Sequence, residues 1–128
     1  MTHRCSLRRD KSGTAIIEFA LAVPVLLVFI YGIFQIGVAF QASSGMQHAL
    51  GEGARFATIF PVPTDAQIKT RVSDRVFGTG IGTFTVADPV TVTNYKTLRV
   101  TFTMPTNFLL FAGPQITLIR TKRVYIAV

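Results

Sequence analysis

The chain has 128 residues, enough for one modest domain, and its mean hydropathy of +0.45 is high while only 15% of its residues are charged. The net charge is +7, but the basic residues form neither the stripe nor the motif of a nucleic-acid-binding protein, so we expect no nucleic-acid partner. The single cysteine, Cys5, excludes an intramolecular disulfide and a cysteine-based metal site.

An apolar run near the N-terminus explains the high hydropathy. Residues 15–40 contain one formal charge, Glu18. About 20 apolar residues suffice for a helix to cross the hydrocarbon core, so we expect a transmembrane helix over residues 14–40. Four Lys and Arg residues precede the run closely, and none follows before Arg55. This asymmetry predicts a cytoplasmic N-terminus and an exported C-terminal part.

Two other export signals fit the sequence less well. A cleavable secretory signal could end at 42–44, but its apolar stretch spans only about 7–15 residues, and here the run is longer and contains an acid. The pair Arg8-Arg9 is similar to a twin-arginine signal, except that Asp10 and Lys11 stand where apolar residues are expected.

Beyond the membrane the helix is expected to continue over residues 41–60. One apolar face would comprise Met46, Leu50, Gly53, Ala57 and Phe60. Beside it, small residues recur every four positions: Gly45, Ala49, Gly53 and Ala57. Such a ridge permits a second helix or a sheet to approach closely. The sequence leaves open a break at Gly51–Gly53, because each glycine weakens a helix by about 1 kcal/mol.

A small exported α+β domain is predicted over residues 61–128. Pro61 and Pro63 end the first helix, and Thr64 can cap a second one over 66–77. Alternation with a period of two then predicts strands at 83–87, 90–94, 97–104 and 115–126, with a loop at 105–114. The predicted fold class is α+β: a long N-terminal transmembrane and amphipathic helix packed on a small antiparallel sheet of three or four strands. The helix face at 46–60 would supply the other layer of the core, because 61–128 alone buries too little surface.

The loop at 105–114 carries an apolar cluster, Phe108–Phe111, which either fills the core beneath the sheet or contacts neighbouring subunits or the membrane surface. Polar side chains give no sign of chemistry. No nucleophile–base set or metal motif is present, and Asp65, Asp74 and Asp88 are separated and expected at the solvated surface. We therefore expect no catalytic residue, no metal and no cofactor.

The stretch GTAIIEF, residues 13–19, resembles the processing site of type IV pilin-like proteins. In that family a basic leader ends in glycine, a membrane aspartic peptidase cuts after it on the cytoplasmic side, and an acid is the fifth residue after the cut. The resemblance implies that Gly13 ends the leader 1–13 and that Thr14 becomes the new N-terminus. Glu18 is then the fifth mature residue, followed by Phe19.

The apolar run and a following "EGAR" element resemble one branch of that family, the TadE-like minor pilins or pseudopilins of tight-adherence (Tad) systems. The element comprises Glu52, Gly53, Ala54 and Arg55. The resemblance is strong over residues 8–60 and only architectural over 61–128. A sister TadF-type subunit remains an alternative.

The resemblance implies a precursor in the bacterial inner membrane, with a periplasmic C-terminal domain, that a prepilin peptidase cuts. Its partners would be membrane lipid, the inner-membrane assembly platform, the major pilin and a TadF-type minor pilin, and its role would be biogenesis or assembly of a Tad-type (type IVc) adhesive pilus. The alternative function is an uncleaved, single-pass, membrane-anchored binding domain that enters no filament.

Two residues of the apolar run have a functional and an ordinary interpretation. A charged carboxylate within hydrocarbon costs about 2.5–3.5 kcal/mol. The resemblance implies that Glu18 faces the free amine of Thr14 on a neighbouring subunit; alternatively, Glu18 lies near the headgroups, where it costs little. Pro24 is either a weak point or kink that lets the helix repack during assembly, or an ordinary proline of a membrane helix.

Overall fold

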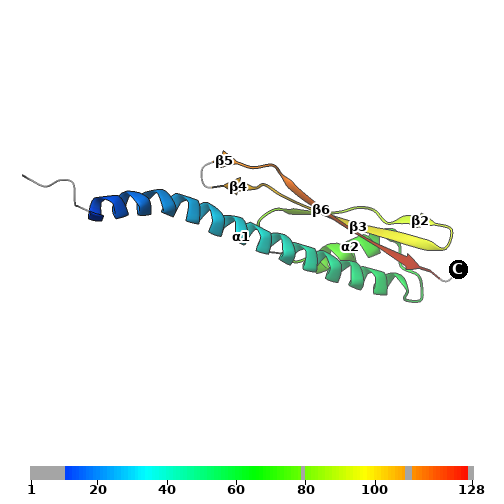
Figure 1. The fold of residues 1–128 in the computed structure, drawn as a ribbon. Helices are drawn as coiled ribbons and strands as arrows, with labels where there is room; N and C mark the ends of the chain where they lie inside the picture. Colours follow the sequence, from blue (N-terminus) through cyan, green and yellow to red (C-terminus); the bar gives the residue numbers. More distant parts are fainter. Residues whose placement is uncertain (1–10, 79, 109–110, 127–128) are drawn as a thin grey trace, which may run out of the picture.

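The computed structural model describes residues 11–78, 80–108 and 111–126. One helix, α1, dominates it and runs without interruption over 47 residues from Lys11 to Ala57. The first turns of α1 project away from the rest of the molecule, and its second half lies against a small sheet and a short helix (Figure 1). This arrangement confirms the predicted α+β fold with a long N-terminal helix.

The helix α1 neither breaks at its central glycines nor reaches Phe60. It continues through Gly51 and Gly53 because the core packs against this part of it, and it ends at Ala57. Backbone hydrogen bonds from Thr58 to Arg55 and from Ile59 to Phe56 close tighter turns there. Phe60 is 92% exposed, so its expected place on the apolar helix face is wrong.

The second helix, α2, spans Asp65–Arg75 and begins as predicted at Thr64. The Thr64 hydroxyl accepts a hydrogen bond from the amide of Gln67, whose side chain accepts one from the amide of Thr64. This reciprocal pair satisfies two amides that a helix start leaves free. Ile68 and Val72 are buried against α1, so α2 lies beside the C-terminal half of α1.

The main sheet has four antiparallel strands centred on β3, Tyr95–Met104. One edge of β3 pairs along its whole length with β6, Ile116–Tyr125. The other edge pairs with two short strands in succession, β1 (Thr83–Val86) and β2 (Val90–Val92). Asp88 and Pro89 lie between β1 and β2 and interrupt this edge, which carries one extra residue relative to β3.

The core lies between one face of the sheet and the two helices. Alternate residues of β3 point into it, as the predicted half-buried strand requires: Lys96, Leu98, Val100, Phe102 and Met104. They meet Met46, Ala49 and Leu50 of α1. The helix face at 46–57 is therefore the second layer of the core.

The segment predicted as a loop at 105–114 contains a small hairpin. Its strands are β4, Asn107–Phe108, and β5, Phe111–Ala112. Gly113 donates its amide to the carbonyl of Thr106, which closes the base of the hairpin. The hairpin extends beyond the main sheet alongside α1, toward the N-terminus (Figure 1). The side chains of the cluster Phe108–Phe111 lie outside the described residues, so its two interpretations both stay open.

Candidate membrane anchor and assembly surface

The N-terminal part of α1 is apolar and exposed on all sides. From Gly13 to Phe34 no residue is buried, and the first buried side chain is that of Gln35. The helix is long and apolar enough to cross a membrane, with a mean hydropathy of 2.5 over its most apolar 18 residues, none of which is buried. Apolar side chains exposed around a whole helix are unfavourable in water and favourable in hydrocarbon.

The residues expected to take part in processing and assembly all lie on this exposed part. Gly13 and Thr14 are in the first turns of α1, and a side chain added at Gly13 would meet nothing within 4 Å. Thr14 and Glu18 are one helical turn apart on the same face, and Phe19 beside them is exposed. Pro24 is exposed too, and the helix continues through it.

The small-residue ridge of α1 lies against α2 and the segment after it, as the sequence predicts. Gly45, Ala49, Gly53 and Ala57 are all buried. A Cβ atom at Gly45 would overlap the carbonyl oxygen of Phe77, and one at Gly53 would overlap Cγ2 of Val72. A side chain at either position would displace its neighbours, because their atoms fill the space that it would take.

The "EGAR" element joins the two helices. Gly53 and Ala54 are buried, whereas Glu52 reaches α2, where one of its oxygens lies 4.0 Å from a guanidinium nitrogen of Arg71. The same guanidinium lies over the ring of Phe56, 5.8 Å from its centre. Arg55 is exposed, and its carbonyl accepts a hydrogen bond from the hydroxyl of Thr58. The element lies far from Glu18, about 51 Å along the helix, so the two do not form one site.

A partly buried ion pair was not expected from the sequence. Lys96 on β3 is only 8% exposed, and its ammonium lies 2.5 Å from a carboxylate oxygen of Asp65 at the start of α2. The side chain of Asp65, expected at the solvated surface, is half exposed and also pairs with this ammonium. The sequence does contain a signal for the burial of Lys96. This residue lies two residues before Leu98, so it has the same inward direction as the buried residues of the strand.

A second missed residue is Gln35, the one strongly polar side chain between Phe19 and Phe40. Its amide nitrogen donates a hydrogen bond of 3.0 Å to the backbone carbonyl of Asn107 in the hairpin. This bond ties the apolar half of α1 to β4. The partner lies 72 positions away, so only the three-dimensional structure reveals it.

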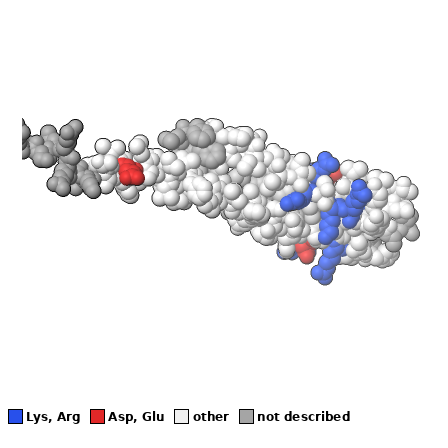
Figure 2. Space-filling model, in the orientation of Figure 1, with Lys and Arg blue, Asp and Glu red and all other residues white. Residues whose placement is uncertain are grey.

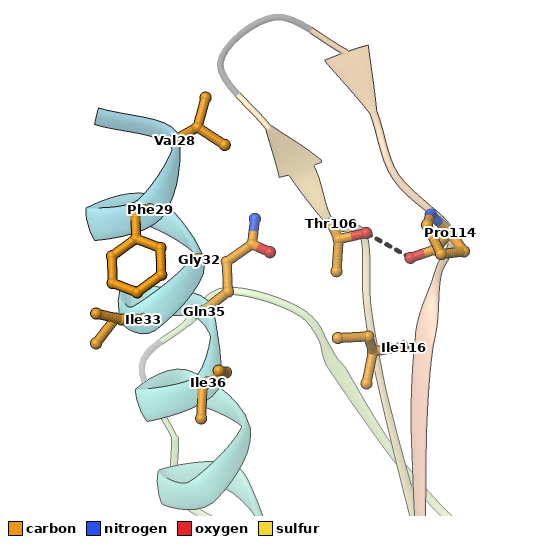
Figure 3. Close-up of a pocket in the computed structure, with 9 residues that line it drawn as sticks. All are labelled: Val28, Phe29, Gly32, Ile33, Gln35, Ile36, Thr106, Pro114 and Ile116. Atoms are coloured by element: carbon orange, nitrogen blue, oxygen red, sulfur yellow. Dashed lines mark hydrogen bonds between the residues drawn. The ribbon is translucent and has the colours of Figure 1, made fainter. Parts of the chain in front are cut away.

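Next to this bond, an open hollow of about 520 Å³ lies between α1 and the base of the hairpin. Figure 3 shows Gln35 pointing from α1 toward Thr106, with Ile116 of β6 on the far side. The hydroxyl of Thr106 donates a hydrogen bond to the carbonyl of Pro114. Most of the other lining residues are apolar: Val28, Phe29, Gly32, Ile33, Ile36, Pro114 and Ile116.

The stretches of chain around this hollow contain no charged side chains. No Asp, Glu, Lys or Arg occurs on α1 between Glu18 and Glu52, or in the chain between Arg99 and Arg120. On the face in Figure 2, the basic side chains gather at the sheet end, and a broad uncharged band separates them from a single acidic group near the start of α1. Across the described residues, no group of three His, Cys, Asp or Glu side chains could hold a metal ion.

The described residues thus form a long N-terminal helix, exposed along its first turns and packed under a small sheet along its second half, which is the arrangement that the resemblance implies. The family model described as TadE-like protein matches residues 13–55, which cover the exposed span, the small-residue ridge and the "EGAR" element. The resemblance seen in the sequence is thereby confirmed, and the match associates this segment with Tad pilus systems. No curated protein and no solved structure gives a significant match.

Proposed function

We propose that the chain is a minor pilin or pseudopilin of a Tad-type adhesive pilus. It is inserted in the bacterial inner membrane with its C-terminal domain in the periplasm, and a prepilin peptidase cuts it after Gly13. The mature chain then joins the major pilin and other minor subunits at the inner-membrane assembly platform. The observation that carries the proposal is the spacing of Gly13, Thr14 and Glu18 on an exposed helix within the family match.

The cut changes the chemistry of this helix end. It frees the α-amine of Thr14, one turn from the carboxylate of Glu18. Both charges are unfavourable in hydrocarbon, and pairing them between neighbouring subunits relieves both costs only in the correct register. Glu18 therefore acts in assembly and not in catalysis.

The mature N-terminus tests the processing step directly. Mass spectrometry of the chain extracted from membranes of cells that contain the peptidase should show Thr14 as the first residue, and a Gly13→Val variant should keep its leader. An intact leader in the unaltered chain would favour the alternative, an uncleaved membrane-anchored binding domain. A start near Gly45 would instead indicate a secretory signal and contradict both functions.

A pair of variants tests the role of Glu18 in assembly. Glu18→Gln removes the charge and keeps the shape, whereas Glu52→Gln changes an acid that contacts Arg71 in the folded domain. We expect Glu18→Gln to insert in the membrane and be cut normally but to reduce piliation, counted by electron microscopy, by about tenfold or more, the effect of losing about 1.4 kcal/mol of pairing. Glu52→Gln should leave piliation nearly unchanged. Normal piliation in the Glu18→Gln variant would contradict the assembly role.

A further inference from the structure

We propose that lipid acyl chains fill the hollow between α1 and the β4–β5 hairpin. These lipids belong to the periplasmic leaflet of the inner membrane, so that the base of the hairpin lies within this leaflet. The proposal rests on the membrane anchoring in the proposed function but not on processing or filament assembly. It makes the exported domain a partly immersed body and not one that stands clear of the lipid surface.

The length of the exposed helix places the hairpin at this depth. The hydrocarbon core is about 30 Å thick, which corresponds to about 20 helical residues. A span that begins at Thr14 therefore ends near Ile33, two residues before Gln35, the first buried residue of α1. Val28 and Gly32 line the hollow, and Val28 then lies about 8 Å below the outer boundary of the hydrocarbon.

A membrane span shifted toward the N-terminus would keep the hairpin out of the lipid, but it is less favourable. A span of the same length that ends before Val28 would begin near Arg8 and would contain Arg9 and Lys11. It would also bring Glu18 to the middle of the bilayer, where a carboxylate costs most. The charges at the N-terminus thus push the span outward until the hollow enters the periplasmic leaflet.

The polar groups at the hollow suit a surrounding without water. The amide nitrogen of Gln35 donates to the carbonyl of Asn107, and the hydroxyl of Thr106 donates to the carbonyl of Pro114. The backbone of Gly113 donates to Thr106, and Asn107 pairs with Ala112 across the hairpin. Non-helical backbone is tolerated at membrane depth when its polar groups find partners within the protein.

The occupant should be lipid because the hollow continues the exposed surface of the candidate membrane span. Its volume of about 520 Å³ lies in the range of ligand sites, about 300–1,000 Å³, and its lining is mostly apolar. No charge on the neighbouring stretches of α1 or of the chain between Arg99 and Arg120 opposes immersion. Lipid surrounds this level of α1 whenever the chain stands alone in a bilayer.

Tryptophan fluorescence in lipid vesicles can test this inference, because the chain contains no tryptophan. Four single variants of the full chain are reconstituted in phosphatidylcholine vesicles whose acyl chains carry bromine, a quencher, at different depths. Gly32→Trp probes the hollow, and Ala112→Trp probes the hairpin. Leu21→Trp marks the middle of the span, and Tyr125→Trp marks the far end of β6; both side chains are exposed.

We expect bromine near the outer boundary of the hydrocarbon to quench Gly32→Trp and Ala112→Trp, bromine closer to the middle of the bilayer to quench Leu21→Trp, and Tyr125→Trp to be unaffected. Quenching of both Gly32→Trp and Ala112→Trp by acrylamide in the water, with Leu21→Trp still quenched by bromine, would overturn the inference and leave the anchor intact. Shielding of both from lipid and water would overturn it in favour of a second copy of the chain. Loss of quenching at Leu21→Trp would contradict membrane anchoring itself.

Discussion

The small-residue ridge of α1 allows two chemically identical substitutions to be compared in one helix. An alanine at Gly45 would place its Cβ against the carbonyl oxygen of Phe77, whereas an alanine at Gly51 would meet only the tip of Lys122, 4.0 Å away. Each change gains about 0.5–1 kcal/mol, because alanine loses less backbone entropy in a helix than glycine. Only the change at Gly45 also overpacks the core, at a cost of about 1–3 kcal/mol. The difference between the two variants isolates the overpacking cost.

The assay is thermal unfolding of the full chain in detergent, followed by near-ultraviolet circular dichroism, which reports the packing of aromatic side chains in the folded C-terminal domain. A difference of 1 kcal/mol shifts the melting temperature of a domain this small by about 4–8 °C. We expect Gly51→Ala to melt a few degrees above the parent chain and Gly45→Ala to melt at least about 4 °C below Gly51→Ala. Equal melting temperatures would refute the close contact between α1 and the segment that follows α2.

Two further pairs of variants test the packing of α2 by the same assay. Asp65→Asn leaves the buried ammonium of Lys96 without its counter-ion and should cost about 1–2 kcal/mol, less than for a fully buried pair because Asp65 is half exposed. Lys96→Met keeps the packed stem without the charge and should cost under about 1 kcal/mol, so the reverse order would contradict the ion pair. Thr64→Ala removes the helix cap and should cost about 1 kcal/mol, whereas Thr70→Ala, on the exposed side of α2, should cost under about 0.5 kcal/mol. Equal losses at Thr64 and Thr70 would argue against the cap.

Local sequence patterns predict most of the fold because they report the side-chain environment directly. The apolar run predicts the bare half of α1, the small residues at every fourth position predict its contact with α2, and the period of two predicts β3. The cap at Thr64 follows from residue chemistry in the same way. Each of these features depends on neighbours within a few positions along the chain.

Features that depend on distant partners could not be predicted. The Gln35–Asn107 bond joins residues 72 positions apart, and the Lys96–Asp65 bond joins residues 31 positions apart. The hairpin within 105–114 has strands of only two residues each, too short to show an alternation. The end of α1 before Phe60 depends on backbone turns at Thr58 and Ile59 that hydropathy does not report. The candidate processing site, by contrast, is visible entirely in a short stretch of sequence, 13–19.

The two edges of the main sheet have a consequence for how copies of this chain can meet. Sheet edges invite strands from other molecules, and proteins discourage this with charges, short strands and bulges. One edge here is divided into β1 and β2 with an extra residue between them, and the strand at the other edge, β6, carries Arg120, Lys122 and Arg123. Both edges therefore resist strand exchange between molecules, and we expect self-association to proceed through the bare apolar helix, which has no such protection.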